Sequence, residues 1–142
     1  MPKESMVLSV RLPRATGERL KRLARRAGRT PSDATARLVE EGLRRADFAF
    51  IDFRDSALGR QAFIMGSRLP VWLAAKLAET AEGGAAGLAR RLCRPAAHIR
   101  AALNYAAAFP DEIAAAIEES ASFDLEKLSR LLPHVETFLV RE

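Results

Sequence analysis

The sequence predicts a mainly α-helical protein that begins with a β-α-α unit and continues into a small helical unit with a short β-hairpin. Residues 6–12 alternate like a single β-strand, and two segments with helical spacing follow, separated by Gly28 and Pro31. A lone strand leaves backbone groups unpaired, and a second copy of itself is the simplest partner. The strand therefore predicts an intermolecular antiparallel ribbon in a homodimer or a higher oligomer.

Alternation divides the side chains of residues 6–12 between two faces. We expect the apolar face to form the core of the dimer, and it carries Leu8, Val10 and Leu12. The opposite face points away from that core, and it carries Val7, Ser9 and Arg11.

The composition is that of a folded protein, with 49% hydrophobic residues and a mean hydropathy of −0.08 over 142 residues. Cys93 is the one cysteine in the sequence, so no intrachain disulfide can form and a reducing compartment is expected. No apolar stretch is long enough to span a bilayer, and the N-terminus lacks the apolar core of a signal peptide. We therefore expect a cytoplasmic protein without a membrane partner.

Charge and composition predict three parts: a first unit over residues 1–47, a second over 48–121, and an apolar, acidic tail over 122–142. Residues 1–47 carry 12 basic and 6 acidic side chains, whereas residues 110–142 carry 3 basic and 8 acidic ones. This asymmetry indicates an anionic partner at the front of the chain and a different partner at the rear.

Two helices are predicted in the first unit. The first follows Pro13 and ends at Gly28, where a left-handed cap is expected. The second opens with Thr30 as N-cap, Pro31 at the first helical position and Asp33 at the capping-box position. One side of this second helix carries Thr35, Leu38, Val39, Gly42 and Leu43.

The run SVRLPRATGERLKRLARRAGRTPSDATARLVEEGL resembles the CopG/MetJ/Arc ribbon-helix-helix repressors over roughly the first third of the chain. A strand ending in Arg-Leu-Pro, a Gly-Arg-Thr turn and the capping region at Ser32 occur in order. The resemblance implies a dimer whose two-stranded ribbon enters the major groove of operator DNA.

The resemblance also implies which residues contact DNA. Val7, Ser9 and Arg11 occupy the base-reading positions, and a guanidinium at Arg11 can bond O6 and N7 of guanine together. The start of the second helix is implied as a phosphate clamp formed by Arg29, Thr30 and Ser32. Thr30 and Ser32 are equally well explained as helix caps.

The second unit opens with a predicted β-hairpin, in which a loop with Ser56 and Gly59 joins two apolar runs: Phe48, Phe50, Ile51 and Phe53, then Phe63 and Ile64. A helix of about a dozen residues is expected from Pro70 to Gly83-Gly84, with Trp72, Leu73 and Leu77 in the core. Three further helices are predicted, over Ala85–Leu92, from near Pro95 to Phe109, and over Pro110–Ser120.

The stretch from FIMGSRLPVW to IRAALNYAAAFPDEIAAAIEE is similar to small bacterial domains of the VapB antitoxin type, whose core resembles a helix-turn-helix. Gly66-Ser67-Arg68-Leu69-Pro70-Val71 follows their Gly-Thr-Arg-Ile-Pro-Val-like run. The chain departs from the pattern at Met65, where these domains have a basic residue, and at Ala96-Ala97, where they have acidic ones. Such proteins repress their operon and mask a toxin, commonly a PIN-like ribonuclease.

Two sets of residues in the rear of the chain have two interpretations each. Arg90, Arg91 and Arg94 either contact DNA phosphates or form a solvated helix end, and Arg68 is expected to anchor the hairpin to the helices. The tail either packs on the preceding helices or binds a toxin through its apolar positions. These positions are Phe123, Leu125, Leu128, Leu131, Leu132 and Phe138.

The sequence holds no P-loop, nucleophile elbow or paired-carboxylate motif, so we expect no catalytic residues, no cofactor and no enzymatic activity. His98 and His134 stand isolated, so no metal site is expected either. The predicted function is that of a dimeric antitoxin that binds double-stranded operator DNA and neutralises a cognate toxin protein. The alternative is a stand-alone ribbon-helix-helix regulator whose second domain oligomerises or senses a ligand.

Overall fold

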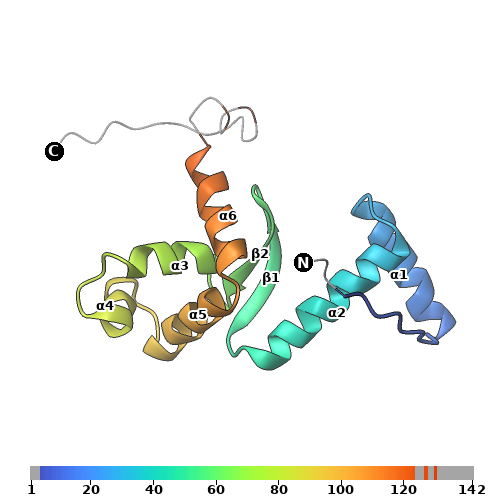
Figure 1. Ribbon diagram of the computed structural model, residues 1–142, viewed down its shortest axis with the longest axis horizontal. Coiled ribbons are helices and arrows are strands. Elements are labelled where there is room, and N and C mark those ends of the chain that lie inside the picture. Colours follow the sequence, from blue (N-terminus) through green and yellow to red (C-terminus); the bar gives the residue numbers. More distant parts are fainter. Residues whose placement is uncertain (1–3, 124–126, 128–129, 131–142) are drawn as a thin grey trace. The chain divides into compact units, whose positions relative to one another are not determined.

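The computed structural model describes residues 4–123, 127 and 130 of the chain. It divides into two compact units, Met1–Leu43 and Arg44–Glu142, called unit 1 and unit 2 below. The described residues form six α-helices and one two-stranded antiparallel sheet, which confirms the predicted mainly α-helical class (Figure 1). Among these residues, no helix has the length and apolar character needed to cross a membrane.

Unit 1 contains helix α1 (Arg14–Arg26) and most of helix α2 (Pro31–Asp47). The predicted turn between them is confirmed: Gly28 has a φ of 61°, and the backbone N–H of Arg29 bonds to the carbonyl of Ala24 at 2.9 Å. Thr30 caps α2, because its hydroxyl accepts the N–H of Asp33 at 3.1 Å and donates to the Asp33 carboxylate at 2.7 Å.

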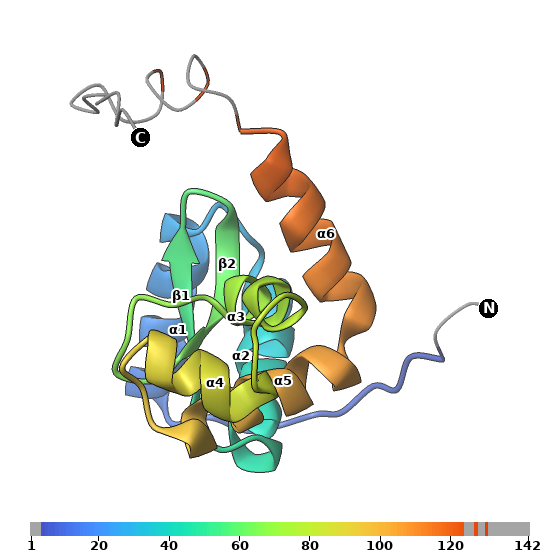
Figure 2. The ribbon, with the colours of Figure 1, turned by 90° about the vertical axis from the view of Figure 1, so that its left-hand side faces the viewer.

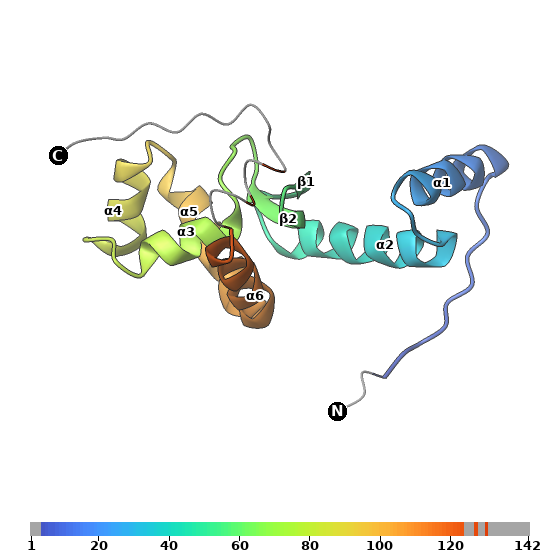
Figure 3. The same cartoon turned by 90° about the horizontal axis from the view of Figure 1, so that it is seen from above.

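The predicted strand over residues 6–12 is not formed by the single chain. Residues 4–13 belong to no helix or strand, and Figure 3 shows them running away from α1. A strand exists through its pairing, and the described part of one chain offers this segment no partner strand. The intermolecular ribbon therefore stays a prediction about two copies.

Unit 2 begins with the last turn of α2, followed by the predicted hairpin of β1 (Ile51–Ser56) and β2 (Gly59–Ile64). The strands are antiparallel, with Ile51 opposite Ile64 and Ser56 opposite Gly59. Phe48 and Phe50 lie before β1, not in it, and Phe50 adopts a φ of 58°. Inward-facing hairpin side chains form one side of the core: Ile51, Phe53, Ala62 and Ile64.

Four helices complete this core (Figure 2). They are α3 (Val71–Ala78), α4 (Gly84–Arg91), α5 (Ala96–Ala108) and α6 (Pro110–Ala121). Helices α3 and α5 pack against β2, and α4 and α6 pack on α3 and α5. Helices α4, α5 and α6 match the prediction to within one residue at each end, because prolines and glycines mark most of their boundaries. Their largest fully buried side chains are Leu88, Ile99 and Tyr105.

Helix α3 differs from the prediction in length and in its buried face. It ends at Ala78, not at Gly83-Gly84, and Gly83, with a φ of 78°, is the N-cap of α4. Its fully buried residues are Val71 and Ala74, whereas the predicted core residues Trp72, Leu73 and Leu77 are half-buried. The indole N–H of Trp72 donates to Gln61 Oε1 at 3.3 Å, and this polar bond keeps the ring at the edge of the core.

Candidate nucleic-acid interface

The side chains predicted to read bases are exposed in the single chain. Val7, Leu8 and Val10 are 75–91% exposed, so both faces of the segment are open to solvent. Ser9 and Arg11 are exposed as well. Nothing in the described chain covers the side chains that were expected to form the apolar core of the dimer.

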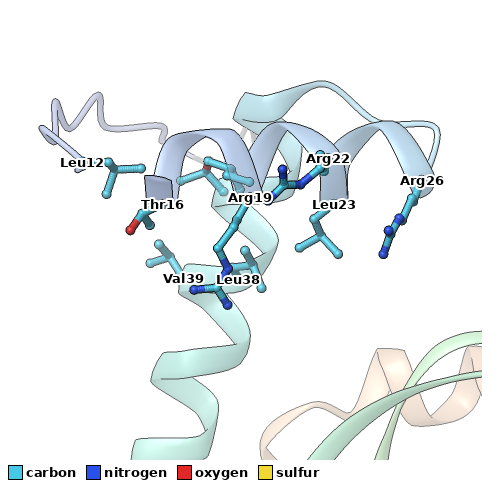
Figure 4. A pocket seen from close by; sticks show the side chains of 10 residues that line it. Leu12, Thr16, Arg19, Arg22, Leu23, Arg26, Leu38 and Val39 are labelled. Carbon is cyan, nitrogen blue, oxygen red and sulfur yellow. The ribbon is translucent and has the colours of Figure 1, made fainter. Parts of the chain in front are cut away.

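An apolar groove of about 790 Å³ lies between α1 and α2 in unit 1 (Figure 4). Four of its apolar side chains, Leu12, Leu23, Leu38 and Val39, are 44–55% exposed. The apolar side expected on α2 therefore meets apolar side chains of α1, and together they form an open surface. The groove is lined by Leu12, Thr16, Arg19, Leu20, Arg22, Leu23, Arg26, Thr35, Leu38 and Val39.

Unit 1 buries very little apolar surface as a single chain. Its buried hydrophobic residues, among those described, are Ala24 and Ala34. Burying a leucine or valine side chain contributes about 1.5–3 kcal/mol, and small domains need most of their large apolar side chains for stability. The groove therefore leaves large apolar side chains of unit 1 in contact with solvent in the single chain.

The predicted phosphate clamp lies at the start of α2. Arg29, Thr30 and Ser32 are exposed there, but the Thr30 hydroxyl is already bonded to Asp33. Thr30 thus acts as the helix cap, and the carboxylate of Asp33 lies in the first turn, where it competes with an incoming anion. The side chains of Arg29 and Ser32 remain available for a phosphate.

Unit 2 contains a polar cluster around the buried Tyr105 that no motif in the sequence predicts. Arg44 Nη1 lies 2.6 Å from the Tyr105 hydroxyl and 2.6 Å from Glu112 Oε2, and the hydroxyl donates to Glu112 Oε1 at 2.8 Å. The Arg44 guanidinium also lies 3.8 Å from the centre of the Phe109 ring. These contacts fasten the last turn of α2 to α5 and α6.

The surroundings of Tyr105 hold its phenol in the protonated form. Burial raises the pKa of its phenol well above the usual value, and the hydrogen bond to Glu112 raises the pKa further. The phenol therefore stays protonated and donates a hydrogen bond at physiological pH. A group held in this form does not act as a base.

Arg68 does not have the anchoring role predicted for it. It is exposed and makes no polar contact with the described residues. Arg54 anchors the hairpin instead: its Nη2 donates to the Ser67 carbonyl, and its guanidinium lies 4.4 Å from the centre of the Phe63 ring. The physical reason is that Arg54 lies within β1 and can reach across β2, whereas Arg68 lies in the exposed turn before α3.

The remaining predicted sites lie in the rear of the chain. Arg90 and Arg91 belong to the last turn of α4, Arg94 follows that helix, and all three are exposed. In the tail, Phe123 is half-buried, and the centre of its ring lies 4.6 Å from Lys127 Nζ. The other predicted toxin-binding positions lie outside the described residues: Leu125, Leu128, Leu131, Leu132 and Phe138.

Comparisons of the chain with protein-family models, with curated proteins and with solved structures found no match.

Proposed function

We propose that this protein is a homodimeric DNA-binding antitoxin that represses its own operon and neutralises a toxin. The observation that carries the DNA-binding part is the open apolar groove of unit 1, together with the adjacent alternating segment over residues 6–12. A second copy supplies both missing partners at once, because it pairs the segment as a ribbon and covers the groove. Such a dimer presents Val7, Ser9 and Arg11 from two chains on one surface.

Charge supports DNA as the ligand of that surface. Residues 1–47 carry twice as many basic as acidic side chains, and the exposed Arg29 and Ser32 beside the start of α2 suit a phosphate. The ribbon is proposed to read bases, whereas the start of α2 is proposed to hold the backbone.

Replacing Arg11 with alanine should weaken binding to selected DNA by about 1–3 kcal/mol and relax the base preference. Dimer stability should change little, because an exposed arginine contributes little to folding. The test selects binding sites from a random-sequence duplex pool with the wild-type protein, then measures affinity for selected and scrambled duplexes.

Arg29→Ala is the matched control for that experiment. It removes one arginine from the phosphate clamp, so it should weaken binding to selected and scrambled duplexes alike and lower the salt dependence. If Arg11→Ala also weakens both duplexes equally, Arg11 does not read bases.

The toxin-binding part of the proposal rests on the acidic rear of the chain. Residues 110–142 carry 8 acidic side chains against 3 basic ones, and four of the acids lie on α6: Asp111, Glu112, Glu118 and Glu119. A ribonuclease handles an anionic substrate and presents a basic surface that such a segment can cover. The apolar tail positions supply affinity in this proposal, and the acids supply orientation.

Deleting residues 122–142 should abolish co-purification with the product of the neighbouring gene and its neutralisation, while DNA binding persists. The measurements are co-expression pull-down and growth rescue, with the full chain as reference. If the truncated chain still neutralises, the toxin contact lies in residues 48–121. If neither chain binds a neighbouring gene product, the protein is a stand-alone regulator.

A further inference from the structure

The arginines over residues 44–100 fall into two classes. Four of them are paired with carboxylates: Arg44 with Glu112 at 2.6 Å, Arg45 with Asp52 at 3.1 Å, Arg54 with Asp52 at 3.9 Å and Arg60 with Asp55 at 3.6 Å. A second group is exposed and has no ion pair or hydrogen bond from its side chain within the described part of the chain. This group consists of Arg68, Arg90, Arg91, Arg94 and Arg100, and Lys76 shares its properties.

Three of the unpaired arginines are gathered by a tight turn at the end of α4. Cys93 has a φ of 52°, its N–H bonds to the Arg90 carbonyl at 3.2 Å, and the Arg94 N–H bonds to the Ala89 carbonyl at 2.9 Å. This reversal brings the backbone of Arg90, Arg91 and Arg94 together at the C-terminal end of α4, and the guanidinium of Arg90 reaches back toward Gly83 and Gly87 in the first turn of the helix. We call these three residues the α4 cluster.

Helix α4 is fixed firmly enough to present the α4 cluster. Leu88 and Ala89 are buried in the core of unit 2. At the start of the helix, Gly87 lies so close to the backbone of Glu82 that a Cβ there would be 1.8 Å from the Glu82 carbonyl oxygen. The backbone that carries Arg90 and Arg91 is therefore already ordered before an anion binds.

The helix dipole does not explain all of this charge. Arg90 and Arg91 lie in the last turn of α4, where a cation gains about 0.3–1 kcal/mol. Arg94 lies beyond the helix, and Arg100 lies in the N-terminal half of α5, where the dipole offers a cation no benefit. The basic character thus extends past the residues that stabilise α4.

Apart from Glu79 and Glu82, which precede α4, the acidic residues over positions 44–121 lie in other elements. Helix α6 carries four acidic and no basic side chains, and Figures 2 and 3 show α4 and α6 well apart within the unit. Unit 2 therefore has a basic end and an acidic helix, and an anionic partner fits only the basic end.

We infer that the α4 cluster is a second contact of this protein with the phosphate backbone of double-stranded DNA. The inference rests on the proposed function, since DNA held by unit 1 is then available to unit 2 of the same chain at high effective concentration. The neighbouring side chains of residues 84–93 are glycine, alanine, leucine and cysteine, without the amides or hydroxyls that help to read bases. The cluster therefore adds affinity without sequence preference.

The test measures the affinity of the full-length protein for a fluorescein-labelled 40-base-pair random-sequence duplex over a salt series. Each phosphate contact contributes about 0.9 to the slope of log K against log salt. The variant R90Q/R91Q/R94Q should lower this slope by about 2 or more and weaken binding at least tenfold at low salt. The charge-preserving variant R90K/R91K/R94K should keep most of the slope.

The control R68Q/K76Q removes two other exposed, unpaired charges of unit 2. If this control lowers the slope as much per charge as the triple glutamine variant, only the overall charge matters and the inference is wrong. It is also wrong if the triple variant loses thermal stability while its slope is unchanged, because the arginines then serve the helix dipole. If the wild-type protein shows no salt-dependent binding to the duplex, the proposed function itself fails.

Discussion

Leu38→Asp should convert the protein from a dimer into a monomer and abolish its binding to DNA. Leu38 lines the groove of unit 1 and is 44% exposed in the single chain. In a symmetric dimer the substitution acts twice, and each copy loses about 2 kcal/mol of apolar burial. The lost burial alone weakens the dimer about a thousandfold, and placing an unpaired carboxylate in the interface weakens it further.

Sedimentation at about 10 μM protein and anisotropy on duplex DNA check this prediction together. Ala36→Asp is the matched control, because it adds the same charge to an exposed position of α2 that does not line the groove. The control should remain a DNA-binding dimer. A dimeric Leu38→Asp protein, or a wild-type protein that sediments as a monomer with an ordered N-terminus, would show that the groove is not the dimer interface.

Tyr105→Ala should destabilise unit 2 by about 3–5 kcal/mol, the usual cost of removing a buried aromatic ring. The ring is fully buried and contacts the rings of Phe48 and Phe109, with centroids 5.3 Å and 4.8 Å away. Tyr105→Phe keeps the ring and should cost only about 1 kcal/mol. Urea unfolding measures both, and equal losses for the two variants would assign the effect to the hydroxyl alone.

The pH dependence of the free energy of unfolding tests the contribution of the Tyr105 hydroxyl apart from that of its ring. The pKa of the Tyr105 phenol is raised in the folded protein, so its stabilising contribution is fully present below the unfolded pKa near 10 and decreases as the pH rises above it. Wild-type stability should therefore fall above about pH 10 by more than that of Tyr105→Phe. Identical slopes above this pH would contradict the raised pKa.

Local signals in the sequence were sufficient for most of the fold. Gly28, Thr30 and Asp33 define the turn between α1 and α2 through their own backbone and side-chain chemistry. Two apolar runs joined by a loop with Ser56 and Gly59 predicted the hairpin, and the prolines at 95 and 110 marked the starts of α5 and α6. These features depend on neighbours within a few residues, which is why a single sequence reveals them.

What the sequence did not reveal depends on residues far apart or on a second chain. Arg44 meets Tyr105 and Glu112 across 61 and 68 positions, and no spacing rule connects such residues. The segment over residues 6–12 requires a partner strand that one chain does not contain.

The close approach at Gly87 also determines how freely this sequence can diverge. A Cβ at position 87 would lie 1.8 Å from the Glu82 carbonyl oxygen, so any side chain there clashes with the backbone. A Cβ added at Gly17 or Gly42 meets no atom within 4 Å. Both of these glycines lie in helices, where alanine is favoured by about 1 kcal/mol. Descendants of this chain can therefore exchange glycine at 17, whereas Gly42 lies on the side of α2 that the proposed second copy covers, and glycine must stay at 87 for as long as α4 keeps its place.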